Sequence, residues 1–142
     1  MTLAFWDSSA LVKLLVEEAG TDTAVTLWDD AARVVASRLS IPEVNAALAA
    51  AERCGRIDGP RARAALDEWR RYRDALDIIE LSAEIAEQAA GMAMKHPLSG
   101  ADAVHLAAAR ALRDRELVLA TWDRRLGTAA AAEGISVIGA DF

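Results

Sequence analysis

The chain has 142 residues, the size of one ordinary domain, and can bury a core without disulfides or a structural metal. Hydrophobic residues make up 54% of it, and the single cysteine, Cys54, excludes an internal disulfide and a cysteine-based zinc site. The net charge of −6 at pH 7 argues on its face against a nucleic-acid partner, because phosphate contacts require Lys and Arg.

The first half of the chain alternates short apolar runs with amphipathic segments. Strands are predicted for residues 3–6 and 33–37, and helices for residues 10–18, 23–32 and 40–54. Three signals open the last of these helices: Ser40 can be the N-cap, Pro42 falls in the first turn, and Glu43 completes a capping box with Ser40.

The second half continues the alternation. Helices are predicted for residues 61–75, 82–95, 99–114 and 123–133, and strands for residues 77–81, 117–121 and 135–138. Short apolar strands flanked by helices indicate a parallel sheet covered on both faces, which is an α/β three-layer fold. Since the sequence contains no linker, repeat or low-complexity block, we expect one domain over residues 1–142.

Three carboxylates follow predicted strands. Asp7 comes directly after the first strand, Glu43 a few residues after the second, and Asp123 just after the strand over 117–121. Ligands of an open parallel sheet bind at the carboxyl ends of its strands, so these acids should lie near one edge. Clustered carboxylates favour Mg²⁺ or Mn²⁺, which can polarise a phosphoryl oxygen and activate a water.

Helix capping is a second interpretation of the same acids. Asp7 and Asp123 could be N-caps, and Glu43 could only complete the Ser40 capping box. Asp102 likewise ends a capping-box pattern that starts at Ser99, and it follows a helix rather than a strand, so topology does not place it near the others. The spacing of the acids leaves both interpretations open.

Four motifs in register carry a resemblance to a known family. They are Phe5–Leu14 with Asp7, Ser40–Leu48 with Glu43, Leu98–Ala108 with Asp102, and Leu119–Leu126 with Asp123, and Ile135–Ile138 matches a closing strand. Together they resemble the PIN domain, specifically the VapC-like toxin ribonucleases of bacterial and archaeal toxin–antitoxin pairs. The resemblance spans essentially the whole chain. It implies a five-stranded parallel sheet between helices, with all four acids converging on one pocket.

The resemblance also implies roles for individual residues. Asp7, Glu43, Asp102 and Asp123 would hold one or two Mg²⁺ or Mn²⁺ ions for hydrolysis of an RNA phosphodiester. Ser9 and Thr121 would orient the site or contact substrate, with helix capping as the alternative, and Arg124 would meet a phosphate or remain solvated. His105, one helical turn beyond Asp102, is expected to be a packed or supporting residue.

The partners that the resemblance implies are RNA, such as tRNA or an rRNA loop, a small antitoxin, and a second copy of the chain in a homodimer. From Arg53 to Arg73 there are seven arginines against three acids, a local charge of +4. This arginine run could receive RNA or acidic parts of an antitoxin, or it could be a solvated helix face.

The sequence also bears on the cellular location of the protein and on alternative functions. Residues 1–6 contain neither a basic region nor an apolar stretch of signal-peptide length, and no segment could span a membrane, so we expect a cytoplasmic protein. A catalytically silent PIN-like domain that binds RNA or protein is the main alternative. A phosphotransfer domain is disfavoured because Ser9 stands where a phosphatase of the haloacid-dehalogenase type needs a second Asp.

Overall fold

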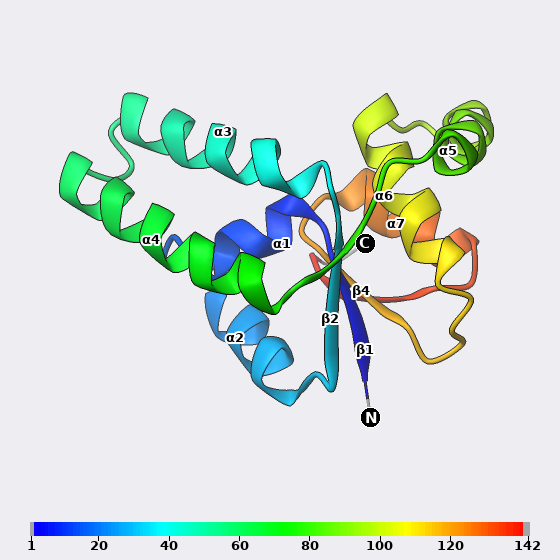
Figure 1. The fold of residues 1–142 in the computed structure, drawn as a ribbon, viewed down its shortest axis with the longest axis horizontal. Helices are drawn as coiled ribbons and strands as arrows, with labels where there is room; N and C mark the ends of the chain where they lie inside the picture. The colour runs from blue at the N-terminus through cyan, green and yellow to red at the C-terminus, as the bar shows by residue number, and fades with distance from the viewer. Residues whose placement is uncertain (1, 141–142) are drawn as a thin grey trace.

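A five-stranded, all-parallel sheet lies at the centre of the computed structural model, which describes residues 2–140 (Figure 1). Its strands are β1 (Leu3–Trp6), β2 (Arg33–Ser37), β3 (Asp77–Ile79), β4 (Val118–Thr121) and β5 (Ser136–Gly139). They are arranged in the order β3-β2-β1-β4-β5. The predicted α/β three-layer fold with a five-stranded parallel sheet is therefore confirmed.

Helices cover both faces of the sheet. They are α1 (Ser8–Lys13), α2 (Thr21–Asp30), α3 (Ser40–Arg53), α4 (Gly59–Ala75), α5 (Ala83–Lys95), α6 (Gly100–Ala111) and α7 (Arg124–Ala132). Side chains alternate along a strand, so Ala4 and Trp6 of β1 join the core under α1–α4, while Phe5 joins the core under α6 and α7. Helix α5 packs on α6. Across the described residues, none of these helices is long and apolar enough to cross a membrane.

The order of the strands reverses between β1 and β4. From β1 the chain moves outward on one side through β2 and β3, then crosses to β4 and β5 on the other side. Residues Phe5 and Trp6 of β1 are in register with Leu119 and Ala120 of β4. A reversal of this kind opens a crevice at the carboxyl ends of the two strands, which is the usual ligand site of such a sheet.

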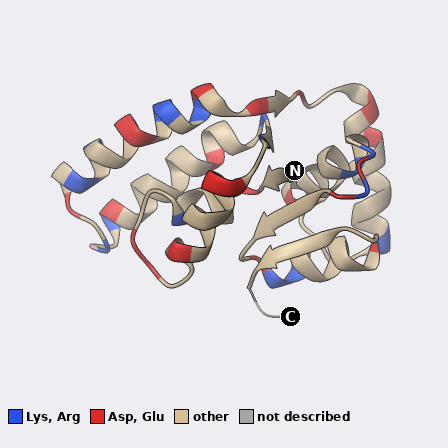
Figure 2. Ribbon diagram, turned by 90° about the horizontal axis from the view of Figure 1, so that it is seen from below, with Lys and Arg blue, Asp and Glu red and all other residues tan. Residues whose placement is uncertain are grey.

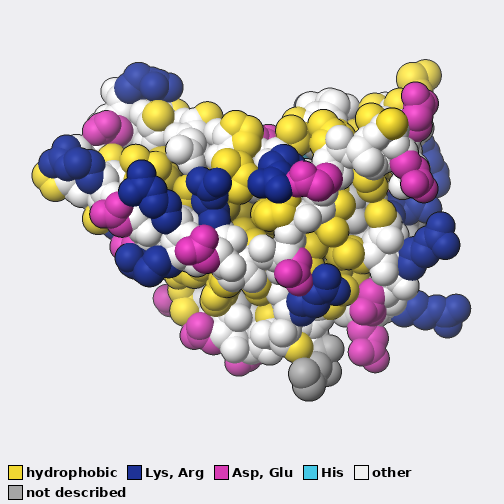
Figure 3. All heavy atoms as spheres, in the orientation of Figure 1, with side chains coloured by type: hydrophobic (Ala, Val, Ile, Leu, Met, Phe, Trp, Pro, Cys, Tyr) yellow, Lys and Arg dark blue, Asp and Glu magenta, His cyan; other side chains and the backbone are white. Residues whose placement is uncertain are grey.

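Two helical arms extend beyond the carboxyl ends of the strands. One consists of α3 and α4, and the other of α5 and α6 (Figure 1). The surface is hollowed between them, above the point where β1 and β4 end (Figure 3). Basic and acidic side chains alternate along the arm of α3 and α4 (Figures 2 and 3).

The first helix differs from its predicted range of 10–18. It begins earlier, at Ser8, because the Asp7 side chain accepts a hydrogen bond from the backbone N–H of Ala10. It ends earlier, at Lys13, because the N–H groups of Leu14 and Leu15 bond to carbonyls only three residues back, which tightens the turn. The other predicted elements exist with boundaries shifted by a few residues at most.

The predicted capping box at Ser40 is wrong. Leu39, in a helical conformation, occupies the N-cap position of α3, and no side chain of residues 2–140 caps this helix. The Ser40 hydroxyl is buried and has no hydrogen-bond partner among the described residues. Because the Glu43 carboxylate contacts Ser8 and His105 instead, capping does not explain why an acid stands at this position.

Candidate active site

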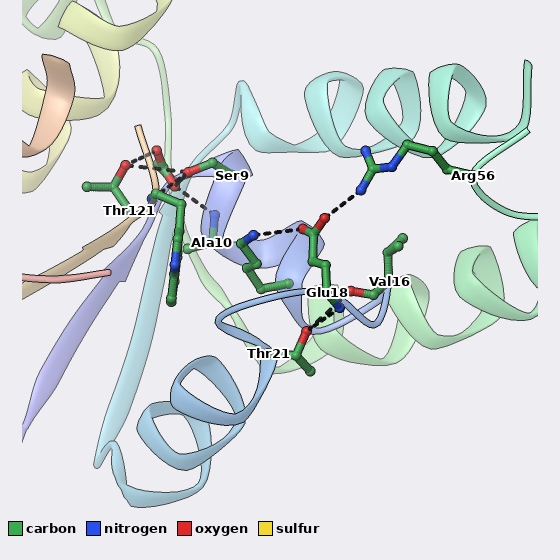
Figure 4. A network of polar contacts seen from close by, with 10 residues as sticks. Ser9, Ala10, Val16, Glu18, Thr21, Arg56 and Thr121 are labelled. Carbon is green, nitrogen blue, oxygen red and sulfur yellow. Dashed lines mark hydrogen bonds and ion pairs between the residues drawn. The ribbon is translucent and has the colours of Figure 1, made fainter. Parts of the chain in front are cut away.

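Asp7 is a buried carboxylate at the carboxyl end of β1, only 3% exposed. Its Oδ1 accepts hydrogen bonds from the Ala10 N–H (2.9 Å) and the Ser9 hydroxyl (2.7 Å), and its Oδ2 accepts one from the Thr121 hydroxyl (2.5 Å; Figure 4). Burial raises the pKa of Asp7 above its ordinary value despite these bonds. Asp7 therefore caps α1, and keeping its buried side chain charged costs free energy of folding.

The hydroxyls of Ser9 and Thr121 join Asp7 to the segment after β4. Thr121 Oγ1 accepts from the backbone N–H of Asp123 at 3.0 Å, and Ser9 Oγ accepts from that of Trp122 at 2.9 Å. The two hydroxyl oxygens lie 3.4 Å apart. Both residues therefore orient the Asp7 carboxylate and connect it to the backbone that carries Asp123.

Glu43 projects from the first turn of α3 toward α1 and α6. Its Oε1 accepts a hydrogen bond from the Ser8 hydroxyl at 2.7 Å and lies 2.6 Å from His105 Nε2. Burial works to raise the pKa of Glu43, but the hydrogen bond and the charge of His105, with help from Ser8, lower it overall. Glu43 is therefore held as a carboxylate by partners from two other helices.

Asp102 lies near the other acids although it starts from a different layer of the fold. It sits in the first turn of α6, where the Ser99 hydroxyl accepts a hydrogen bond from its backbone N–H at 3.1 Å. Burial and then the negative charge of Asp123 raise the pKa of Asp102, and Glu43 adds to the effect. Asp102 is therefore close enough to Asp123 and Glu43 for their negative charges to act on it.

Asp123 precedes α7 and caps it, since its Oδ1 accepts from the Leu126 N–H at 3.0 Å. Arg124 follows as the first residue of α7; it is exposed and makes no ion pair within the part of the chain that the structure describes. Its guanidinium is therefore free to contact a ligand from its place directly after Asp123.

The oxygen donors at this site are of the kind that a hard divalent cation prefers. Glu43 Oε2 and Asp123 Oδ2 accept no hydrogen bond from residues 2–140, so each has both lone pairs available. Across these residues, no group of three or more His, Cys, Asp or Glu side chains already surrounds a common metal position. The donor chemistry fits Mg²⁺ or Mn²⁺, and a cation would offset the repulsion that raises the pKa of Asp102.

Sequence reasoning missed Ser8. Its hydroxyl contacts Glu43, but in the sequence it only stands between Asp7 and Ser9 as part of a helix start. The one signal that could have identified it is its place beside a candidate acid. His105, expected to be packed or supporting, is 1% exposed and contacts Glu43.

Part of the arginine run stabilises the fold. Arg56 pairs with Glu18 at 2.5 Å, and Arg61 donates to the carbonyl of Leu15 and pairs with Glu68 at 3.2 Å. These contacts hold the loop after α1 against α4 and the segment between α3 and α4. Arg53, Arg63 and Arg71 are exposed and make no ion pair within residues 2–140.

Comparisons with known proteins identify the family of the chain. Residues 4–132 match the PIN domain family. Ribonuclease VapC45 from Mycobacterium tuberculosis (strain CDC 1551 / Oshkosh) is 45% identical over 142 residues, which cover all of this chain and 99% of VapC45.

Two solved structures share the fold. Mycobacterium tuberculosis VapC20, described as a sarcin–ricin-loop-cleaving toxin, matches with a TM-score of 0.68 and 24% identity, over 89% of this chain and 94% of its own. A toxin–antitoxin complex from Klebsiella pneumoniae matches with a TM-score of 0.67 and 22% identity, over 95% of each chain.

Proposed function

The chain belongs to the PIN-domain family, and we propose that it is a metal-dependent endoribonuclease acting as the toxin of a toxin–antitoxin pair. Its full-length relative is a ribonuclease, which supports RNA hydrolysis as the activity. The observation that carries the proposal is the geometry around Asp7, a carboxylate 3% exposed at the carboxyl end of β1 that the Thr121 hydroxyl joins to the backbone of Asp123. Capping of α1 by Asp7 does not require this second connection.

We propose Asp7, Glu43, Asp102 and Asp123 as the residues that would hold Mg²⁺ or Mn²⁺. When bound, such an ion supplies an activated water and stabilises charge on the phosphate. The neighbouring side chains keep the acids in place: Ser9 and Thr121 fix Asp7, while Ser8 and His105 fix Glu43. Arg124, exposed directly after Asp123, would contact a phosphate of the RNA.

A small antitoxin is the proposed protein partner. The Klebsiella pneumoniae structure with this fold is a toxin–antitoxin complex, and an acidic crevice suits an Arg or Lys side chain from such a partner. We also propose a homodimer, which sedimentation of the free protein would test. As substrate we propose a structured RNA, either tRNA or an rRNA loop, because VapC20 is described as cleaving the sarcin–ricin loop.

Cleavage of RNA by the purified protein, with Mg²⁺, with Mn²⁺ or with EDTA, tests the proposal. Asp7→Asn and Asp102→Asn should abolish cleavage while circular dichroism stays unchanged. Asp67→Asn is the matched control, because Asp67 is an exposed carboxylate paired with Arg70 at 3.1 Å, and it should cleave at the wild-type rate.

Two results would contradict the proposal. Cleavage that persists in EDTA would show that hydrolysis does not require a metal ion. Failure to cleave any RNA, combined with absence of Mn²⁺ binding, would favour a catalytically silent domain that binds RNA or protein.

A further inference from the structure

A separate hollow of about 240 Å³ opens beside the carboxylates, between α1, α3 and the segment after β4. Its lining includes Ser8, Ser9, Lys13, Glu18, Ala47 and Trp122, and we refer to it as the indole pocket. Ser8 and Ser9 line it on the side where their hydroxyls bond to Glu43 and Asp7. A group in this pocket is therefore next to the proposed site of hydrolysis.

Trp122 is held in place on several sides. Its backbone N–H donates to Ser9 Oγ, and the Lys13 ammonium lies over its ring, 5.6 Å from the ring centroid. Gly20 has a φ of +98°, and a Cβ added there would lie 2.6 Å from Trp122 Nε1, so the indole fills the space of a side chain at position 20. The ring is a preformed aromatic wall.

Lys13 and Glu18, which are paired with each other, place a hydrogen-bond donor and an acceptor in the pocket. Lys13 Nζ lies 3.1 Å from Glu18 Oε1, and Arg56 holds the other oxygen of Glu18 at 2.5 Å (Figure 4). Thr21 fixes the loop beneath them, since its hydroxyl accepts from the Glu18 N–H (3.1 Å) and donates to the Val16 carbonyl (3.3 Å).

The chemistry of the indole pocket suits a single nucleobase. An aromatic ring offers a surface on which any base can stack, and a neighbouring ammonium and carboxylate can bond to the edge of that base. The volume is below the roughly 300–1,000 Å³ of pockets for drug-sized ligands, so the pocket admits one small planar group. Lys13 and Arg56 neutralise the charge of Glu18 within the pocket.

We propose that the indole pocket binds one base of the RNA, adjacent to the phosphodiester that is cleaved, and contributes to the choice of cleavage site. On binding, the Lys13 ammonium leaves its place over the Trp122 ring and its contact with Glu18 Oε1, the base stacks on the indole, and Lys13 and Glu18 bond to the edge of the base. This inference rests on the proposed ribonuclease function and identifies the indole pocket as a source of its sequence preference.

Titration with the four nucleoside 5′-monophosphates, and with ribose 5-phosphate as a probe that lacks a base, tests the proposal in the presence of Mg²⁺. At least one nucleotide should quench the tryptophan fluorescence of the intact protein with saturation, and ribose 5-phosphate should not. Trp28→Phe is the matched control: Trp28 packs against Trp6 and Tyr72, away from the pocket, so the quenching should remain.

Calorimetric titration of variants separates stacking from a structural effect. Trp122→Leu should weaken nucleotide binding about 5- to 150-fold, whereas Trp122→Phe should keep the affinity within about threefold but lose the quenching. Lys13→Gln and Glu18→Gln should change the order of preference among the four nucleotides. Thermal melts of the same samples establish that each variant is folded.

Three results of the binding experiments would contradict the proposed role of the indole pocket. They are equal affinity for ribose 5-phosphate and nucleotides, unchanged affinity in Trp122→Leu, and quenching by an antitoxin peptide but by no nucleotide. Binding is measured without hydrolysis. If the protein binds nucleotides at Trp122 but cleaves no RNA, only the proposed ribonuclease activity is contradicted. If Trp122→Leu cleaves RNA with the kcat/KM of the wild type, only the proposed role of the indole pocket is contradicted.

Discussion

The Nε2 atom of His105 lies 2.6 Å from Oε1 of Glu43, which joins α6 to α3 across 62 positions of sequence. A carboxylate can only accept, so Nε2 carries the hydrogen. The other ring nitrogen, Nδ1, is buried without a partner among residues 2–140, and the ring meets Phe5 edge-on at 6.4 Å. Apolar packing thus fixes the His105 ring, and its one hydrogen bond orients the carboxylate of Glu43.

Replacing His105 with Leu, which has a similar volume, should lower the free energy of unfolding by about 1.5–3 kcal/mol, because the bond to a charged partner is lost. It should also weaken Mn²⁺ binding roughly 10- to 100-fold, the usual cost of removing a group that orients a metal ligand. Urea unfolding and calorimetry measure the two effects.

The conservative variant His105→Gln isolates the role of the hydrogen bond. Its amide can still donate to Glu43, so Mn²⁺ binding should stay closer to wild type than in His105→Leu. Equal Mn²⁺ affinity in wild type and His105→Leu would show that His105 has a packing role alone.

We expect the Asp7 carboxylate to lower the stability of the fold while being required for RNA cleavage. Burial raises its pKa, so its negative charge at neutral pH costs stability, and Asp7→Asn should raise the free energy of unfolding of the metal-free protein by roughly 0.5–2 kcal/mol. The same substitution should abolish RNA cleavage. Urea unfolding in EDTA, beside a cleavage assay, measures both; a less stable variant would mean that the bonds from Ser9 and Thr121 require the charge.

The positions of Asp7 and Asp123 could be predicted from the sequence, because each follows a short apolar run that had to be a buried strand. Parallel strands carry such residues to the same edge, and the register of β1 with β4 brings the two segments together. The alternation of apolar strands and helices likewise sufficed for the layers of the fold.

The position of Asp102 could not be predicted in this way. It depends on how α6 packs across the sheet, which is a long-range property, and only the family resemblance placed it in the pocket. The capping box at Ser40 failed for a related reason: local pattern favours a bond within one helix, but the Glu43 side chain found Ser8 and His105 on other helices.

Gly139 should tolerate no side chain. Its φ is +144°, and a Cβ there would lie 1.7 Å from the carbonyl oxygen of Thr121, its partner in the sheet. Gly139→Ala should therefore destabilise the fold by about 2–4 kcal/mol, through backbone strain and displacement of β4. Because Thr121 holds Asp7, RNA cleavage should also fall.

Gly91→Ala is the matched control for Gly139→Ala. Gly91 lies within α5, and an added Cβ meets nothing within 4 Å, so this change should stabilise the protein by about 0.5–1 kcal/mol. Chemical unfolding of the two variants should give shifts of opposite sign. Shifts of the same sign would mean that the strand position is less crowded than the structure indicates.

Glu133 should make stability depend on pH. Its side chain is 5% exposed and lies 2.7 Å from Lys95 Nζ, 2.9 Å from His96 Nε2 and 3.5 Å from Arg110 Nη1. The hydrogen bond from Lys95, followed by that from His96, lowers the pKa of Glu133 below its ordinary value of 4.5. A lowered folded pKa stabilises the protein above pH 4.5, and that contribution is lost as the pH falls through the folded pKa.

Glu133→Gln should therefore lower the free energy of unfolding by about 1–3 kcal/mol at pH 7 and pH 5.5, and by progressively less below pH 4.5. Asp67→Asn removes an exposed pair with Arg70 and should change stability by less than about 1 kcal/mol at any of these values. Urea unfolding of wild type and both variants across this range gives the comparison. A Glu133→Gln deficit that stayed constant down to pH 3 would assign the loss to packing of the side chain, since a contribution from its charge must disappear once the carboxylate is protonated.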